Sequence, residues 1–267
     1  MPAANPRAIA KARGLACDVV ILDLEDAVAP DQKSEAREAA RAVAAEGGVG
    51  TRELVVRVNA AATHWGADDL ASIGAGVNAV LLPKVSGPAD VAAARTALGA
   101  DGPSIWAMVE TARGLVALPA LAACAAELRL EALVAGTNDL ALDLRCRPDA
   151  VRTPLLPALA QIVAAARAGE MTALDGVLND IDNPERLAAE CAQGAMWGFD
   201  GKTLIHPAQI DAANAAFGPS AEEVAWARAV IDAFADPANA DRGAIKLNGA
   251  MVERLHLAEA ERILALA

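Results

Sequence analysis

Short runs of aliphatic residues recur along this chain, and most of them end in polar or charged residues. Seven such runs follow one another about every 25 to 35 residues, and Ala-rich stretches with helical spacing, such as 34–45, 90–98 and 184–193, separate them. Continuous apolar runs that alternate with helices are typical of buried parallel strands in βαβ units. The expected strands are Val19–Leu24, Leu54–Asn59, Ala79–Pro83, Ser104–Glu110, Ala132–Thr137, Met171–Val177 and Ala195–Lys202.

Polar side chains gather where these expected strands end. They include Asp23, Glu25, Asp26, Arg57, Asn59, Lys84, Glu110, Asn138, Asp139, Asp175 and Lys202. In a parallel barrel the carboxyl ends of the strands meet on one face, where barrel enzymes keep their chemistry. The pattern therefore predicts an α/β fold of the TIM (β/α)8 type over residues 1–217. Residues 218–267 are expected to form a helical extension, with a hairpin near 244–250 between two helices.

Composition narrows the classes of function. The 267 residues include 23 Lys and Arg against 35 Asp and Glu, and only four Trp, three Phe and no Tyr. A net charge of −12 with so few stacking side chains disfavours a nucleic-acid partner. No apolar run approaches the roughly 20 residues that a bilayer requires, and residues 1–13 lack a signal-peptide pattern. We therefore expect a cytoplasmic protein without membrane contact.

Seven short motifs combine strand ends with particular polar residues. They are DVVILDLEDAV (18–28), RVN (57–59), LPKV (82–85), MVET (108–111), GTNDL (136–140), LDGV (174–177) and GFDGKTLIHPAQ (198–209). In this order they resemble the HpcH/HpaI aldolase and citrate lyase beta-subunit family, especially its malyl-CoA and β-methylmalyl-CoA lyase-like branch. The resemblance implies a barrel, Mg²⁺ with Mn²⁺ as the alternative, acyl-CoA and α-keto acid substrates, and cleavage or formation of a carbon–carbon bond next to a thioester.

The resemblance assigns roles to charged residues at the strand ends. Glu110 and Asp139 match the family's two metal carboxylates, and hard oxygen ligands suit Mg²⁺, although ordinary surface acids are the alternative. Arg57 matches the substrate arginine, whose guanidinium would bind the keto acid and stabilise a developing oxyanion. Its alternative role is a salt bridge with Glu25 or Asp26. These two acids resemble groups that orient Arg57 and metal-bound water.

The same resemblance covers further residues. Gly136, Thr137 and Asn138 lie in a predicted tight turn whose backbone N–H groups would face a substrate carboxylate. Lys84 would meet CoA phosphate or substrate, or would line the barrel rim. Glu253 falls where many relatives carry an Asp that reaches a neighbouring subunit's site as general acid or base, with a surface glutamate as the alternative. A role in trans implies a homotrimer or homohexamer.

The chain departs from the family pattern near its N-terminus. Relatives begin with a strand reading like RSxLFVPG before an Asn-Pro-Arg helix, whereas Met1 is followed here directly by PAANPR. We therefore expect the first barrel strand to be missing, which leaves seven strands. The strands on both sides of the gap would then have unpaired edges that another segment or a partner must cover.

The leading functional hypothesis is an Mg²⁺-dependent lyase. It would cleave malyl-CoA, β-methylmalyl-CoA or a citramalyl-CoA-like substrate into an acyl-CoA and an α-keto acid such as glyoxylate. A first alternative is a malyl-CoA thioesterase, because the same ligands could direct an activated water at the thioester. The others are a citrate lyase beta subunit within a larger complex and a catalytically impaired barrel that only binds or assembles.

Overall fold

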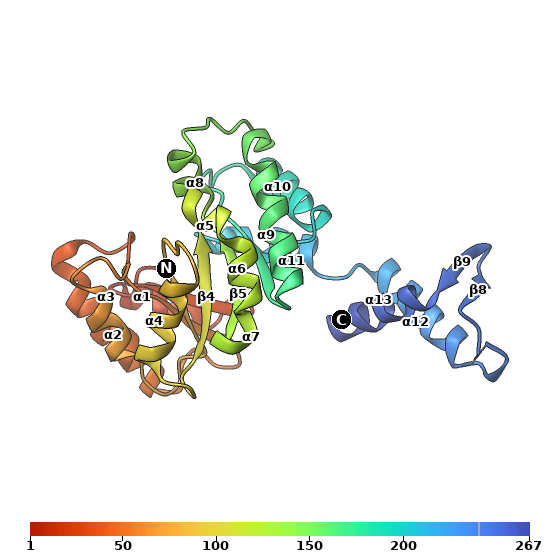
Figure 1. The fold of residues 1–267 in the computed structure, drawn as a ribbon, viewed down its shortest axis with the longest axis horizontal. Coiled ribbons are helices and arrows are strands. Elements are labelled where there is room, and N and C mark those ends of the chain that lie inside the picture. Colours follow the sequence, from red (N-terminus) through yellow and green to blue (C-terminus); the bar gives the residue numbers. More distant parts are fainter. Residues whose placement is uncertain (240) are drawn as a thin grey trace. The chain divides into compact units, whose positions relative to one another are not determined.

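The computed structural model describes residues 1–239 and 241–267, which form two compact units, Met1–Ala213 and Asn214–Ala267 (Figure 1). The first unit is built on one sheet. Its strands are β1 (Val19–Asp23), β2 (Glu53–Arg57), β3 (Ala79–Leu82), β4 (Ser104–Val109), β5 (Leu130–Ala135), β6 (Thr172–Asp175) and β7 (Gly201–Lys202). The helices between and around them are α1 (Pro6–Ala12), α2 (Lys33–Ala45), α3 (Gly66–Ser72), α4 (Pro88–Leu98), α5 (Ala112–Val116), α6 (Leu118–Ala123), α7 (Ala125–Leu128), α8 (Thr137–Asp143), α9 (Leu156–Ala168), α10 (Pro184–Met196) and α11 (Ile210–Phe217).

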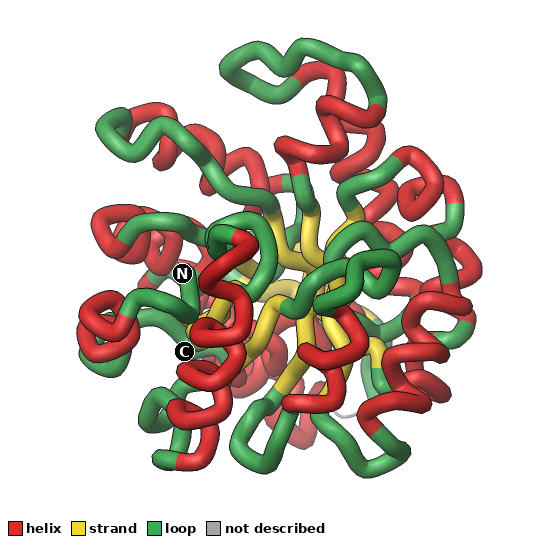
Figure 2. The backbone as a smooth tube through the Cα atoms, turned by 90° about the vertical axis from the view of Figure 1, so that its left-hand side faces the viewer, coloured by secondary structure: helices red, strands yellow, loops and turns green. Residues whose placement is uncertain are grey.

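The seven strands pair in chain order, and every pair is parallel. Figure 2 shows them at the centre, with helices outside. In the described part of the chain no strand closes the sheet between β1 and β7, so the unit is an open half-barrel. This confirms the prediction of an α/β fold of TIM-barrel type that lacks one strand.

The first residues of the chain lie along the free edge of β1. The N–H of Asp23 donates to the carbonyl of Met1 at 2.8 Å, and the N–H of Ala3 donates to the carbonyl of Asp23 at 3.0 Å. Pro2 thereby forms a parallel bridge with Asp23. The edge of β1 is thus paired at its carboxyl end.

The seventh strand is shorter than the sequence predicts. The expected range Ala195–Lys202 begins inside α10, and β7 comprises Gly201–Lys202 alone. The prediction was wrong because the last apolar residues of α10 continue into the strand's apolar run. Periodicity alone does not separate a short buried helix segment from a strand.

The half-barrel interior is lined by alternate strand residues. The buried cluster consists of Val55, Ala79, Leu81, Trp106, Met108, Ala132 and Val134, with Val19, Ile21 and Leu174 packed against it. Successive strand residues point to opposite faces, so counting in steps of two continues each inward column toward the carboxyl ends. The next inward positions are Asp23, Arg57, Pro83, Glu110, Gly136 and Gly176. The apolar interior therefore ends in charged residues at the carboxyl ends of β1, β2 and β4.

The second unit contains two helices and a hairpin. They are α12 (Ala221–Ala235), β8 (Ala244–Leu247), β9 (Ala250–Glu253) and α13 (Arg254–Ala265). Ser220 and Glu223 form a capping box at the start of α12, and β8 and β9 pair antiparallel. The hydrophobic core of this unit includes Phe234, Ile245 and Val252. Of the helices described in either unit, none has the length and apolar character needed to cross a bilayer.

Candidate active site

Arg57 is held by carboxylates from the end of β1. Its Nε and Nη2 donate to the two oxygens of Asp23 at 2.7 and 2.5 Å. Its Nη1 lies 3.0 Å from Oε2 of Glu25 and 3.8 Å from Oδ2 of Asp26. The contacts expected with Glu25 and Asp26 are present, but the bidentate partner is Asp23, to which the sequence analysis gave no role. Strand alternation, which puts Asp23 on the same face as Val19 and Ile21, is the sequence signal that could have identified it, and the parallel register places it opposite Arg57.

In the Arg57–Asp23 pair, the mutual hydrogen bonds and charges affect the pKa of each group more than burial does. Burial by itself lowers the pKa of Arg57, but the hydrogen bonds and charge of Asp23, with Glu25 and Asp26, raise it overall. Burial likewise raises the pKa of Asp23, yet the Arg57 guanidinium and two backbone N–H groups lower it overall. Both groups are therefore charged at neutral pH, and Arg57 is a fixed cation in the site.

Lys84 connects carboxylates that follow three different strands. Its backbone is left-handed, with φ of 51°, and its N–H donates to Oε1 of Glu110 at 2.7 Å. Its ammonium donates to Oε1 of Glu25 at 2.9 Å and lies 3.9 Å from Oδ1 of Asp139. Burial lowers the pKa of Lys84, but Glu25 and the other acids raise it overall. The structure therefore places this lysine among the acidic side chains of the site.

Glu110 and Glu25 are buried acidic groups, and the pKa of each is raised above its ordinary value. Glu110 is 2% exposed. Burial, together with the charges of Glu25 and Asp139, raises its pKa to about 7, although the N–H group and the charge of Lys84 lower it. Burial also raises the pKa of Glu25 overall, although Lys84 and Arg57 lower it. The contact between Arg57 and Oε2 of Glu25 is an ion pair without hydrogen-bond alignment. Among the described residues, Oε2 has no hydrogen-bond partner.

This arrangement suits a divalent cation. The site carries the two cations Arg57 and Lys84 and a larger number of acids, namely Asp23, Glu25, Asp26, Glu110 and Asp139. Residues 1–239 and 241–267 hold no ready-made group of three or more His, Cys, Asp or Glu ligands. Mg²⁺ needs no such group, because it keeps several waters and binds through one or two carboxylates plus substrate oxygens. Glu110 and Asp139 fit that requirement.

The turn between β5 and α8 packs directly on Glu110. A Cβ atom at Gly136 would lie 2.4 Å from Cβ and 2.8 Å from Oε2 of Glu110, so only glycine fits. Thr137 starts α8 and is nearly buried. The side-chain amides of Asn138 and Asn179 donate to each other at 3.3 and 2.9 Å, which ties α8 to the segment after β6. Substrate binding by this turn stays a prediction.

Glu253 lies in the second unit, where β9 meets α13. Its N–H donates to Nδ1 of His256 at 2.9 Å, and its side chain is half-buried. A role of Glu253 in a neighbouring subunit stays a prediction.

A second charged cluster is buried beyond the ends of β6 and β7. Arg152 donates to both oxygens of Asp175 at 2.7 and 2.9 Å. Lys202 donates to Glu190 at 2.7 Å and to Asp175 at 3.3 Å, and also to the carbonyl of Gly176. Two cations balance two carboxylates here, which leaves no net charge for a ligand. The cluster therefore has a structural role in joining β6, β7 and α10.

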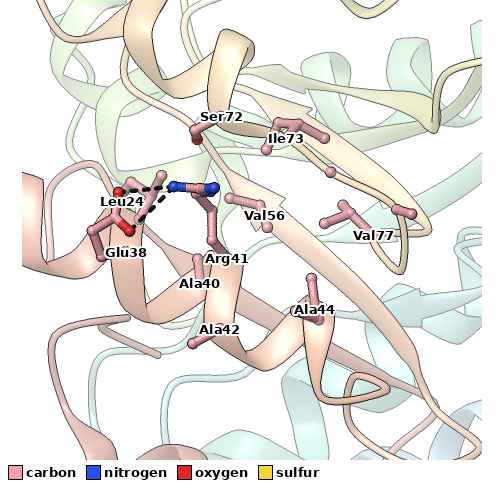
Figure 3. A pocket seen from close by; sticks show the side chains of 13 residues that line it. Leu24, Glu38, Ala40, Arg41, Ala42, Ala44, Val56, Ser72, Ile73 and Val77 are labelled. Carbon is pink, nitrogen blue, oxygen red and sulfur yellow. Dashed lines mark hydrogen bonds and ion pairs between the residues drawn. The ribbon is translucent and has the colours of Figure 1, made fainter.

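A cavity of about 470 Å³ lies on the outer face of the strands, between α2 and residues 72–77 (Figure 3). Leu24 and Val56 line it, and they point away from the interior because they directly adjoin the inward Asp23 and Arg57. Glu38 and Arg41, which form an exposed ion pair, also line it (Figure 3). None of the charged site residues lines this cavity, so the candidate site is a separate feature.

Comparison with known proteins identifies the class. The family described as HpcH/HpaI aldolase/citrate lyase matches residues 1–207. The chain belongs to this enzyme family, which confirms the resemblance carried by its motifs.

Individual relatives support the same assignment over nearly the full length. A (3S)-malyl-CoA thioesterase from Cereibacter sphaeroides is 45% identical over 99% of this chain and 92% of that protein. The citrate lyase subunit beta of Escherichia coli is 32% identical over 95% of this chain and 86% of that protein. The crystal structure of CitE from Mycobacterium tuberculosis in complex with magnesium, acetoacetate and coenzyme A is 36% identical. It covers 100% of this chain and 96% of its own, with a TM-score of 0.79.

Proposed function

We propose that this chain hydrolyses the thioester of a 3-hydroxydicarboxyl-CoA such as (3S)-malyl-CoA, releasing CoA and the free hydroxy acid. The observation that carries this proposal is the 45% identity, over 99% of the chain, to a protein named (3S)-malyl-CoA thioesterase. It supports the thioesterase alternative better than the leading lyase hypothesis. The candidate site contributes cations for an acidic substrate and carboxylates for water and metal.

Arg57 is suited to the free carboxylate of the acyl group. Asp23 takes the Nε–Nη2 edge of the guanidinium, so a substrate carboxylate would pair with the Nη1–Nη2 edge, and the charge of the group does not depend on pH in the neutral range. Asp23 already holds Arg57 in one orientation, so little side-chain freedom is lost on binding. Lys84, with 39% of its side chain exposed, adds a second positive charge beside Glu25 and Asp139.

Glu110 and Asp139 would hold Mg²⁺, or Mn²⁺ in its place. Such an ion, when bound, polarises a carbonyl oxygen and lowers the pKa of a coordinated water. Among the described residues, Oε2 of Glu25 is a buried oxygen that accepts no hydrogen bond, although Arg57 pairs with it as an ion, so we assign it the proton of the attacking water. The water oxygen joins the thioester carbon, the carbon–sulfur bond breaks, and the proton passes to the leaving CoA thiolate.

Carbon–carbon cleavage is the second candidate. The 32% identity to a citrate lyase subunit beta favours it, and so does the similarity to a CitE structure that contains magnesium, acetoacetate and coenzyme A. This reaction would use the same cations and carboxylates, but would yield acetyl-CoA and glyoxylate from malyl-CoA. Service as a citrate lyase beta subunit is a variant of this candidate and would require an acyl carrier partner.

Product analysis separates the candidates. Purified protein is incubated with (3S)-malyl-CoA and Mg²⁺, and free CoA, malate, acetyl-CoA and glyoxylate are each measured. We expect CoA and malate in equal amounts, loss of turnover with EDTA, and recovery with Mg²⁺ or Mn²⁺. Acetyl-CoA with glyoxylate would instead establish a lyase. No turnover at all would contradict both reactions and favour the impaired barrel.

A further inference from the structure

A buried ammonium group lies against the turn that carries Glu25. Lys33, the first residue of α2, is 6% exposed. Its Nζ donates to the carbonyl oxygens of Leu24 and Glu25, each at 2.9 Å. The ring of Trp65 lies over the same ammonium, with its centroid 5.0 Å from Nζ. Lys33 thus contacts the main chain of the site, whereas Arg57 and Lys84 contact the Glu25 side chain.

The partners of Lys33 are unusual for a buried lysine. The ion pairs found within residues 1–239 and 241–267 do not include it, so carbonyl dipoles and an aromatic face compensate its charge. Burying an ammonium without a carboxylate is costly, and charge-assisted hydrogen bonds are stronger than neutral ones. The two carbonyls are therefore held more firmly than a neutral donor would hold them.

The peptide units around Glu25 are clamped from two directions. The N–H groups of Glu25 and Ala27 donate to the two oxygens of Asp23 at 2.9 and 3.1 Å. The carbonyl of Glu25 accepts from Lys33, and with these backbone groups fixed the Glu25 carboxylate reaches Lys84 and Arg57. Asp23 and Lys33 together therefore determine where that carboxylate lies.

Each carbonyl also has a second donor, so the turn does not depend on Lys33 for its existence. The side chain of Asn59 donates to the carbonyl of Leu24 at 2.9 Å, and the N–H of Val28 donates to the carbonyl of Glu25 at 3.0 Å. Removing the ammonium should loosen the turn without unfolding the half-barrel. A loosened turn would misplace the Glu25 carboxylate.

We infer that Lys33 is a positioning residue for the candidate active site, because its ammonium fixes the carbonyl side of Glu25 and thereby aims the Glu25 carboxylate at Arg57 and Lys84. The expected effect on turnover rests on the proposed function. The expected effect on the turn does not.

Hydrogen exchange tests the turn directly. In Lys33→Met, amides within residues 25–28 should exchange at least about 10-fold faster than in the wild type, while β4 and β5 stay unchanged. Lys33→Arg, which keeps charge and donors, should retain most of the protection. Arg41→Met, on the exposed face of the same helix, is the matched control and should leave residues 25–28 unaffected. Lys33→Gln replaces Lys33→Met if the latter does not fold. Unchanged exchange at residues 25–28 would overturn the inference, whatever reaction the wild type catalyses.

A double-mutant cycle tests the link to Glu25. When it is the only change to the wild-type protein, Lys33→Met should lower kcat for thioester hydrolysis about 10- to 100-fold. If Lys33 acts through Glu25, the same change should cost less than about 2-fold in protein that already carries Glu25→Gln. Equal losses in both proteins would show that Lys33 does not act through Glu25 and would overturn the inference. Absence of wild-type turnover would contradict the proposed function alone, and hydrogen exchange would then decide the role of Lys33.

Discussion

At the scale of single residues, Asp23 links a loop and an arginine through one carboxylate. Oδ1 accepts from the N–H of Glu25 and from Nε of Arg57, and Oδ2 accepts from the N–H of Ala27 and from Nη2 of Arg57. Four donors satisfy a carboxylate that is almost fully buried, which is the condition under which a buried charge is tolerated. The orientation of Arg57 and the shape of the Glu25 turn are consequently set by the same side chain.

The charge of Asp23 should make stability depend on pH. Burial alone would raise its pKa, but Arg57 and the backbone donors lower it below the ordinary value of 3.8. A carboxylate with a lowered pKa stabilises the fold above its unfolded-state pKa, and this stability is lost as the pH falls through the folded-state pKa. Asp23→Asn should therefore reduce the free energy of unfolding by about 3 kcal/mol near neutral pH, and the difference should shrink as the pH falls below the ordinary value of 3.8 and through the lowered folded-state pKa. Urea unfolding of both proteins over this range measures the effect, and a difference independent of pH would contradict it.

At the scale of secondary-structure elements, the junction of β5 and α8 is built around Glu110. Gly136 allows the backbone to approach the Glu110 side chain, and Gly176 at the end of β6 approaches Thr137 as closely, since a Cβ atom there would lie 2.6 Å from Oγ1 of Thr137. Gly136 thus lets the end of β5 pack on Glu110 at the end of β4, and Gly176 lets the end of β6 pack on Thr137 at the start of α8. The position of Glu110 therefore depends on backbone packing as well as on its hydrogen bond with Lys84.

Gly136→Ala should displace the Glu110 carboxylate. The added methyl group overlaps Cβ of Glu110, so either the side chain or the turn must move. We expect Mn²⁺ affinity, measured by electron paramagnetic resonance titration, to fall at least about 10-fold. Gly74→Ala is the matched control, because a Cβ atom there meets nothing within 4 Å and Gly74 needs no positive φ. An unchanged affinity for Mn²⁺ in Gly136→Ala would count against Glu110 as a ligand, and so would an equal loss in both variants.

Much of the site was predictable from the sequence because strand periodicity is a local property. Val19, Ile21 and Asp23 share a face, so alternation alone predicts an inward Asp23. The partnership of Lys33 with main-chain carbonyls was not predictable, since it depends on how α2 meets a turn about nine residues away. Nor does composition reveal why Gly136 must be glycine, because the reason is a side chain on the neighbouring strand.

At the scale of the whole molecule, the residues to which the family resemblance gives a role in the reaction lie in both compact units. Arg57 and Glu110 belong to the first unit, whereas Glu253 belongs to the second, between its hairpin and its last helix. The resemblance predicts that Glu253 serves the site of a neighbouring subunit in a homotrimer or homohexamer. Rings of identical subunits use such head-to-tail interfaces, in which each subunit gives one surface and receives another.

Mixed oligomers test whether the site is shared between subunits. Arg57→Ala and Glu253→Ala chains, each of which the shared-site hypothesis predicts to be inactive alone, are coexpressed with different tags and purified as hetero-oligomers. If each site takes Arg57 from one chain and Glu253 from the next, random assembly leaves both residues intact in about a quarter of the sites, so about a quarter of wild-type turnover should return. A site within one chain predicts no recovery, because every chain lacks one of the two groups. Glu110→Gln replaces Arg57→Ala if loss of the arginine, which leaves Asp23 buried without its partner, prevents folding. Hetero-oligomers that form but show no turnover above that of the separate variants would contradict a role of Glu253 in trans.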